Sequence, residues 1–289
     1  GEELPMALVS MGVLLQDAVT QGYAVGGFNV FNFETLSAVT EVAEDVKAPL
    51  VVSIPERLFA FVDAESLCIA VMRAARGSSV PIALHLDHGH TFDGVMKALR
   101  WGFTSVMFDG SALPFEENVK RTKEIAKIAH SLGVSVEGEL GYLCSYGESI
   151  DNLADENFVK ADQVAEFVSR TKVDALAVGI GNNHGRYRGK PKLDYDRIRE
   201  LKAMAQVPLV LHGGSKLSRT DFQEGIANGI AKVNIATDMC VAAISTIKKE
   251  LEKNANIHYV NLMLNVKKGV KESVKKYMVA FGCVNKGQK

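Results

Sequence analysis

The feature that most constrains the fold is a regular alternation of short, apolar, β-branched runs with longer amphipathic stretches. The runs cover residues 24–30, 48–54, 81–87, 105–109, 134–140, 175–180, 208–213 and 231–237. Several have continuous apolar cores, as is typical of parallel strands covered on both faces. Many of the stretches between them open with Asp, Thr or Asn and end at Gly, which are the residues preferred where helices start and stop. The alternation therefore predicts an α/β chain built from eight βα units.

Eight βα units can close into a (β/α)8 TIM barrel. A doubly wound open sheet is the alternative, but it usually carries a G-x-G-x-x-G turn after its first strand, and GGFNVFNFE at that place contains none. We therefore predict a TIM barrel with an extra N-terminal helix over residues 5–21 and a C-terminal helical extension over residues 260–281. No linker divides the chain, so residues 1–289 are expected to form a single domain.

Composition excludes several classes of partner. The formal net charge of −1 predicts no general attraction to nucleic acid or to an anionic membrane surface. The four cysteines lie far apart without a C-x-x-C pair, which argues against a disulfide framework and against a cysteine-based zinc site. Neither a membrane-spanning apolar run nor a secretory signal is visible, so we expect a cytoplasmic protein with reduced thiols.

Polar residues gather where the predicted strands end, which is where TIM barrels build their active sites. His88, His184 and His212 follow the third, sixth and seventh predicted strands. A lone histidine in such a place is more often structural, but three on one rim suit catalytic zinc, which prefers nitrogen ligands and keeps a fourth position open. His85 lies on its strand and is expected inside the barrel. The other three are interpreted as surface or helix-cap residues, and they are His90, His130 and His258.

Two neighbouring features point to chemistry beside such a metal. Asp87 directly precedes His88, where a carboxylate can move a proton, although a plain hydrogen-bonding role is the alternative. The HGGS segment lies at the end of the seventh predicted strand, and the NIAT segment lies at the end of the eighth. Barrels of this type often bind phosphate there through backbone N–H groups and a helix N-terminus, although a glycine pair alone usually marks only a tight turn.

With these residues in place, the sequence resembles the class II ketose-bisphosphate aldolases, the family that contains fructose- and tagatose-bisphosphate aldolases. The resemblance covers nearly the whole chain in family order and spacing. It runs through GFNVFNFE, HLDHG, SVMFDGSALPFEEN, VEGELG, GNNHGRY, PLVLHGGS and KVNIAT.

The resemblance implies a role for each matching residue. His88, His184 and His212 would hold Zn²⁺, which would polarise the C2 carbonyl and stabilise the enediolate. Asp87 would be the acid/base for the C4 hydroxyl, and Glu148 is the nearest match to a loop glutamate that exchanges the dihydroxyacetone phosphate proton. Asp109 and Glu139 match carboxylates that would hold the metal in a second position, or would only buttress the rim. The positions that match contacts to dihydroxyacetone phosphate are Gly185, Gly213, Gly214, Ser215, Asn234 and Thr237.

The chain departs from the family in the half of the site that faces the aldehyde. Ala112 replaces a His, Asn182 and Asn183 replace Thr-Ala, and Lys216 replaces a Gly. Residues 53–59 read SIPERLF instead of a Gln-x-Ser-x-Gly type sequence. The chain is similar in these positions to a variant subset of the family that acts on longer or uronate-like ketose 1-phosphates.

We therefore expect an aldehyde-lyase that cleaves a ketose 1-phosphate to dihydroxyacetone phosphate and an aldehyde. Fructose or tagatose 1,6-bisphosphate is the alternative substrate. An inactive zinc-binding barrel and a phosphate-binding barrel isomerase are the competing functions. Zn²⁺ is the expected cofactor, with a monovalent cation as a further candidate. The expected partner is a small phosphorylated sugar, and the chain is expected to form a homodimer or homotetramer.

Overall fold

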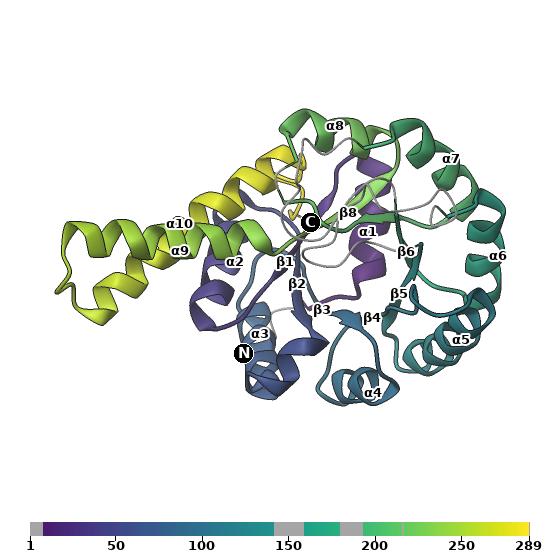
Figure 1. The fold of residues 1–289 in the computed structure, drawn as a ribbon, viewed down its shortest axis with the longest axis horizontal. Helices are drawn as coiled ribbons and strands as arrows, with labels where there is room; N and C mark the ends of the chain where they lie inside the picture. The colour runs from purple at the N-terminus through teal and green to yellow at the C-terminus, as the bar shows by residue number, and fades with distance from the viewer. Residues whose placement is uncertain (1–7, 142–158, 180–192, 216, 289) are drawn as a thin grey trace.

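Eight parallel strands close into a barrel in the order β1 to β8, with β8 paired to β1 (Figure 1). The computed structural model describes residues 8–141, 159–179, 193–215 and 217–288. The strands are β1 (Val25–Asn29), β2 (Leu50–Pro55), β3 (Ile82–Gly89), β4 (Ser105–Phe108), β5 (Ser135–Leu140), β6 (Ala175–Val178), β7 (Leu209–Leu211) and β8 (Ile230–Ile235). The predicted α/β TIM barrel is confirmed.

A ring of helices surrounds the strands, one after each strand, and two further helices lie at the ends of the described chain (Figure 1). Those that follow strands are α2 (Phe33–Val46), α3 (Ala64–Arg76), α4 (Phe92–Arg100), α5 (Phe115–Ser131), α6 (Ala161–Thr171), α7 (Tyr195–Ala205), α8 (Arg219–Ala227) and α9 (Thr237–Lys253). The additional elements are α1 (Met11–Gln21), α10 (Tyr259–Ala280) and the short 3-10 helix η1 (Glu56–Ala60). The extra N-terminal helix and the C-terminal helical extension are therefore confirmed.

The N-terminal helix is shorter than predicted. α1 begins at Met11, whereas Leu8 lies in a parallel bridge with Ile82 and the N–H of Val9 donates to the Ile82 carbonyl at 2.8 Å. These contacts with β3 satisfy backbone groups of Leu8 and Val9, so at these two residues pairing with the strand replaces the helix that apolar periodicity suggested. The helix ends at Gln21 and is capped by Gly22, whose φ of 69° places it in the left-handed region that favours glycine.

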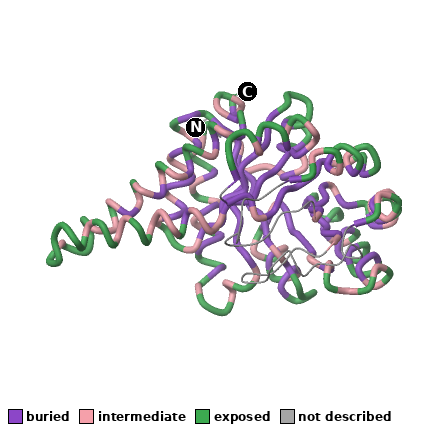
Figure 2. Tube along the Cα trace, turned by 45° about the horizontal axis from the view of Figure 1, so that its top comes forward, coloured by how far each residue is buried: buried purple, intermediate pink, exposed green. Residues whose placement is uncertain are grey.

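Strand alternation divides the buried residues into two chemically different groups. Side chains that face the helices are apolar, as Leu84, Val136 and Val233 illustrate, and all three are fully buried. Side chains from the intervening positions meet across the interior, since Lys232 of β8 contacts Glu137 of β5 although these strands are not neighbours. Figure 2 shows the strands as the buried centre of the molecule, with α9 and α10 extending to one side as a less buried pair.

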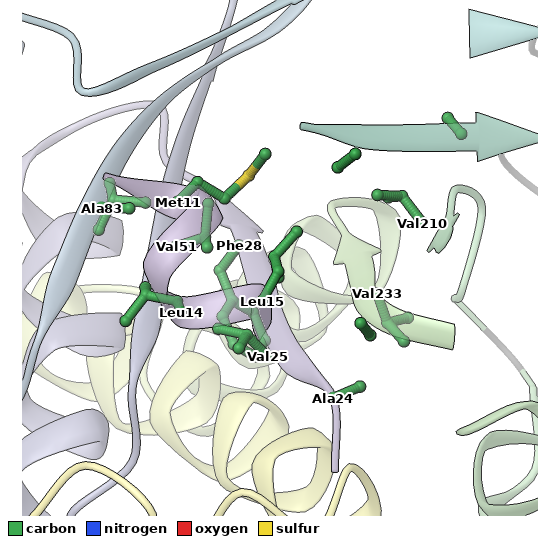
Figure 3. Close-up of a cluster of buried hydrophobic side chains, with 14 of the residues drawn as sticks. Met11, Leu14, Leu15, Ala24, Val25, Phe28, Val51, Ala83, Val210 and Val233 are labelled. Carbon is green, nitrogen blue, oxygen red and sulfur yellow. The ribbon is translucent and has the colours of Figure 1, made fainter. Parts of the chain in front are cut away.

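α1 lies across the end of the barrel where the strands begin. The Gly12 N–H donates to the Ser135 hydroxyl at 2.9 Å, and the Met11 sulfur lies 3.5 Å from the Ser105 hydroxyl. Figure 3 shows Met11 and Leu15 of α1 among apolar side chains of the strands. This end is therefore plugged, and the polar residues at the carboxyl ends of the strands lie at the other end.

Within the described ranges, no helix is long and apolar enough to cross a membrane. Cys68, Cys240 and Cys283 are free thiols, and Cys144 lies outside the described residues.

Candidate active site

The end of β3 is distorted so that two consecutive residues face the same space. In a regular strand Asp87 and His88 would point to opposite faces. The register with β4 shifts between Leu86 and Gly89, and His88 has a φ of 46°, in the left-handed region that non-glycine residues seldom adopt. The distortion brings ligand atoms of Asp87, His88 and His212 within 4.8 Å of one another. Backbone strain of this kind is typical of functional sites.

The two imidazoles point ring nitrogens at each other in a way that suits a shared cation. His88 Nδ1 lies 2.8 Å from Asp109 Oδ2, and His212 Nε2 lies 2.8 Å from Glu137 Oε1. Carboxylates accept hydrogen bonds, so both of these nitrogens carry hydrogen. The lone pairs of the neutral rings then lie on His88 Nε2 and His212 Nδ1, which are only 3.0 Å apart. Two lone pairs at this distance need a proton or a metal ion between them.

These residues fit a divalent metal ion by their chemistry. The second ring N–H of each histidine donates a hydrogen bond to a carboxylate, the arrangement that orients metal-binding imidazoles in proteins. Burial lowers the pKa of His88, but the charge of Asp87 and the hydrogen bond to Asp109 outweigh it and raise this pKa to about 10, which favours a proton on the ring when no metal is bound. His184, the third predicted ligand, lies outside the described residues.

Asp87 is held as an anion next to the histidines. Asn29 donates to its Oδ2 at 2.8 Å and Asn234 donates to its Oδ1 at 3.0 Å. Burial opposes ionisation, but His88, His212 and Lys232 outweigh it and lower the pKa of Asp87 to about 2. The oxygens of both asparagine amides, which are buried, have no hydrogen-bond partner among the described residues. The site therefore combines the fixed carboxylate of Asp87 with two amide oxygens that can accept hydrogen bonds from a ligand.

Two further carboxylates, those of Asp109 and Glu139, flank His88. Glu139 Oε2 lies 3.9 Å from His88 Nδ1 and is buried without a hydrogen-bond partner among the described residues. Burial and the neighbouring Asp109 raise the pKa of Glu139 well above its usual range, so a cation there would favour its charged form. Asp109 stays ionised because the hydrogen bonds from His88 and Ser111 outweigh burial and lower its pKa.

His90, predicted as a surface residue, is exposed, but it also forms a potential metal-binding group with His88 and Asp109. His90 Nδ1 lies 3.8 Å from Asp109 Oδ2. The other histidines lie where they were expected. His85 is fully buried inside the barrel, His130 pairs with Asp174 at the surface, and His258 caps the N-terminus of α10.

The ends of β7 and β8 form a compact backbone turn beside this cluster. Gly213 has a φ of 65°, and a Cβ at Gly214 would lie 2.5 Å from a methyl carbon of Val233, so both positions favour glycine. The N–H of Asp238 donates to the buried Ser215 hydroxyl at 3.3 Å. The eighth predicted strand extends to Thr237, but in the structure Thr237 is the first residue of α9. Backbone N–H groups at such a helix start suit an anion.

Two groups of residues remain: predicted residues that the structure does not describe, and buried residues to which sequence reasoning assigned no role. Glu148 and Gly185 lie outside the described residues. Sequence reasoning assigned no role to Asn29, to Glu137 or to Lys232, although all three are buried in contact with the site. Alternation along the strands could have indicated them, because a charged or amide side chain in an otherwise apolar strand must find a partner in the interior.

The chain is similar to known aldolases over almost its whole length. Residues 9–286 match the family model described as fructose-bisphosphate aldolase class-II. A sulfofructosephosphate aldolase from Alkalicoccus urumqiensis is 36% identical over 98% of this chain and 99% of its own. A fructose-bisphosphate aldolase from Staphylococcus aureus is 35% identical over 98% of this chain and 100% of its own. The crystal structure of the YdjI aldolase from Escherichia coli K12 superimposes with a TM-score of 0.88 at 35% identity, covering 97% of this chain and 100% of that one.

The fold and the site together define a class of protein, a TIM barrel with a histidine and carboxylate cluster at the carboxyl ends of its strands that could hold a metal ion. Within that class, the chain belongs to the class II fructose-bisphosphate aldolase family. It is therefore a lyase of the aldolase type.

Proposed function

We propose that this aldolase uses Zn²⁺ to cleave a ketose 1-phosphate into dihydroxyacetone phosphate and an aldehyde. The observation that carries the proposal is the convergence of His88 Nε2 and His212 Nδ1, 3.0 Å apart, beside the ionised Asp87. Nitrogen ligands favour zinc over magnesium or calcium, which prefer oxygen. His184 is the proposed third ligand, and Asp109 with Glu139 is the proposed second position for the metal.

Asp87 is the proposed acid/base. Its pKa of about 2 keeps it ionised, so it can accept the C4 hydroxyl proton as the C3–C4 bond breaks and return it in the condensation direction. Asn29 and Asn234 hold its two oxygens and fix its direction. A bound zinc ion supplies Lewis-acid polarisation of the C2 carbonyl. Glu148 is proposed to exchange the proton at C3.

The phosphate of the substrate is proposed to bind at the turn formed by Gly213, Gly214 and Ser215 and at the start of α9, where Thr237 lies. A helix N-terminus and its N–H groups attract anions without a net positive charge on the protein. Gly185 is proposed to contact the same ligand.

The aldehyde is proposed to differ from glyceraldehyde 3-phosphate. Pro55, the last residue of β2, pairs with Asp87 in β3, so η1 begins one residue beyond the level of the acid/base. The Glu56 carboxylate accepts hydrogen bonds from the N–H groups of His90 and Thr91 and from the Thr91 hydroxyl, which fastens η1 to the start of α4. The variant segment SIPERLF is thus held in place by hydrogen bonds and lies next to Asp87. Relatives of equal similarity carry the names of different sugar phosphate aldolases, so overall identity does not select the substrate.

Retro-aldol assays with a panel of ketose 1-phosphates and ketose 1,6-bisphosphates test the substrate assignment. Release of dihydroxyacetone phosphate is measured by coupled reduction, with zinc-loaded and metal-free protein side by side. We expect a higher kcat/KM for a 1-phosphate than for either bisphosphate. A clear preference for fructose or tagatose 1,6-bisphosphate would support the alternative aldolase, and no cleavage of any ketose phosphate would support an inactive zinc-binding barrel.

We also propose that the chain acts in the cytoplasm as a homodimer or homotetramer. Free thiols at Cys68, Cys240 and Cys283 support a reducing compartment. The α9–α10 pair supports self-association because it exposes large apolar side chains, among them Ile244, Leu251, Val260 and Leu264. Light scattering after size exclusion tests this proposal, and a monomer at micromolar concentration would contradict it.

A further inference from the structure

The barrel interior holds a buried network of charged and polar side chains that the proposed reaction does not use directly. Lys232, Glu137 and His85 are fully buried and come from β8, β5 and β3. Lys232 Nζ donates to Glu137 Oε2 at 2.7 Å and lies 3.3 Å from His85 Nε2. His85 Nδ1 in turn lies 2.8 Å from the Ser105 hydroxyl. This network lies one layer closer to the start of the strands than Asp87 and Asn234, on the same inward faces of β3 and β8.

Burying a lysine and a glutamate in a barrel costs free energy even when they pair, and a pair of apolar side chains of similar size often stabilises a protein as well or better. The interior of a barrel is filled in layers, and branched apolar residues usually dominate these layers. Packing alone therefore does not account for this pair. Its contacts offer another reason, because the second oxygen of Glu137 accepts a hydrogen bond from His212 Nε2 at 2.8 Å.

We propose that Glu137 and Lys232 are positioning residues that orient His212 toward the metal. The inference rests on the proposed zinc-dependent function. Glu137 holds the hydrogen of His212 on Nε2, which leaves the lone pair on Nδ1, the nitrogen that faces His88. Lys232 donates to the other oxygen of Glu137 and so holds the carboxylate in the orientation in which Oε1 reaches His212. Lys232 is thus two hydrogen bonds away from His212 and does not touch the reacting atoms.

A glycine in β1 leaves room for the side chains of this network. A Cβ at Gly27 would lie 3.1 Å from Lys232 Cε and 2.6 Å from Asn234 Oδ1, so β1 carries a glycine where both side chains pass. The lysine stem therefore runs close along the β1 backbone, and its ammonium group has little freedom to leave Glu137.

Substitutions separate this role from simple stabilisation. His212 and Lys232 bond to different oxygens of Glu137. In Glu137→Gln only one of these two positions keeps an acceptor oxygen and the other carries an NH2 donor, so one of the two partners loses its acceptor. In the double variant Glu137→Gln with Lys232→Met, the amide oxygen is available to His212 and the amide nitrogen can donate to His85, whose Nε2 lies 3.6 Å from Glu137 Oε2. Thr171→Val is the matched control, because among the described residues its buried hydroxyl bonds only to the Phe167 carbonyl within α6.

Zinc affinity is measured with the metal alone, by competition with a chromophoric chelator, and thermal unfolding of the metal-free proteins is recorded in parallel. We expect zinc affinity to fall roughly 10- to 100-fold in Glu137→Gln, the range typical of such outer partners. We expect the double variant to recover most of the loss and Thr171→Val to bind zinc like the wild type. Wild-type zinc affinity in Glu137→Gln would overturn the proposal, and so would a double variant that is no better than the single one.

The ¹⁵N chemical shifts of the His212 ring give a readout that needs no metal and no substrate. In metal-free wild-type protein we expect the hydrogen on Nε2 to be firmly held, and in Glu137→Gln we expect a mixture of tautomers. A wild-type His212 without hydrogen on Nε2 would overturn the positioning role whatever the activity. Correct ring shifts in a protein that binds no zinc would instead leave the positioning intact and contradict the proposed function.

Discussion

Toward the carboxyl ends of the strands, the inside and the outside of the barrel wall are equally buried and chemically opposite. The face toward the helices carries side chains such as Leu84 and Val233, whereas the interior carries Asp87, Glu137 and Lys232, all of them buried. The outer face gains free energy simply by leaving water, and many residue combinations of similar volume would serve. The interior repays its desolvation only through particular hydrogen bonds. The difference teaches that stability resides mainly in the outer layer and chemistry in the inner one.

The largest expected effect is that of Asp87→Asn on the inner layer. Loss of a positioned acid/base typically costs about 10²- to 10⁴-fold in rate, and we expect the kcat of retro-aldol cleavage to fall in this range. The zinc content, measured by atomic emission, is the control. A variant that loses its zinc would identify Asp87 as a ligand and contradict the acid/base assignment.

Leu84→Ala tests the outer layer of the same strand. It removes a fully buried apolar side chain, and we expect the free energy of unfolding to fall by about 2–5 kcal/mol in urea titrations. Zinc affinity and kcat/KM of the folded fraction should stay at the wild-type level. A drop in zinc affinity would break the division between the two faces.

Gly27→Ala adds a single methyl group to the interior, where it meets Asn234 and Lys232. Overpacking of this kind typically costs about 1–3 kcal/mol. We expect stability to fall by this amount and kcat to fall with it, because the displaced Asn234 amide no longer holds Asp87. Urea unfolding and retro-aldol kinetics measure the two effects, and unchanged kcat would show that Asn234 does not position the carboxylate.

The smallest effect concerns one proton. In metal-free protein the pKa of His88 is about 10, so at pH 8 the ring is protonated, and zinc must displace that proton to bind. We expect about one proton to be released per zinc bound at pH 8, as measured by calorimetry in buffers of different ionisation enthalpy. Release should decrease as the pH rises through 10, because the site then loses its proton before zinc arrives. Zinc binding without proton release at pH 8 would contradict the shared position between the rings.

The outer layer was readily predicted from the sequence and the inner layer only partly. Apolar runs and helix caps are local signals, and they placed all eight strands and the terminal helices near their observed positions. His88 and His212 were placed on one rim because strand ends are also local. Alternation could have marked Glu137 and Lys232 as interior residues, but their contact with each other was not predictable, since they lie 95 residues apart in sequence and no local pattern encodes a contact across the barrel.

The distorted end of β3 was not predicted for a related reason. The alternation rule places His88 on the face opposite to Asp87, and only the observed φ of 46° reverses this. The early start predicted for α1 failed because apolar periodicity cannot tell that Leu8 pairs with the edge at Ile82. In each case a tertiary contact outweighed a local preference.

The most direct test of the central claim is hydrogen exchange at C3 of dihydroxyacetone phosphate in D2O, followed by NMR with zinc-loaded and metal-free protein. This half-reaction requires no knowledge of the aldehyde. We predict exchange that depends on zinc and disappears in His212→Ala. An absence of exchange in protein that has zinc bound would contradict the account and favour a barrel that binds metal without catalysing the reaction.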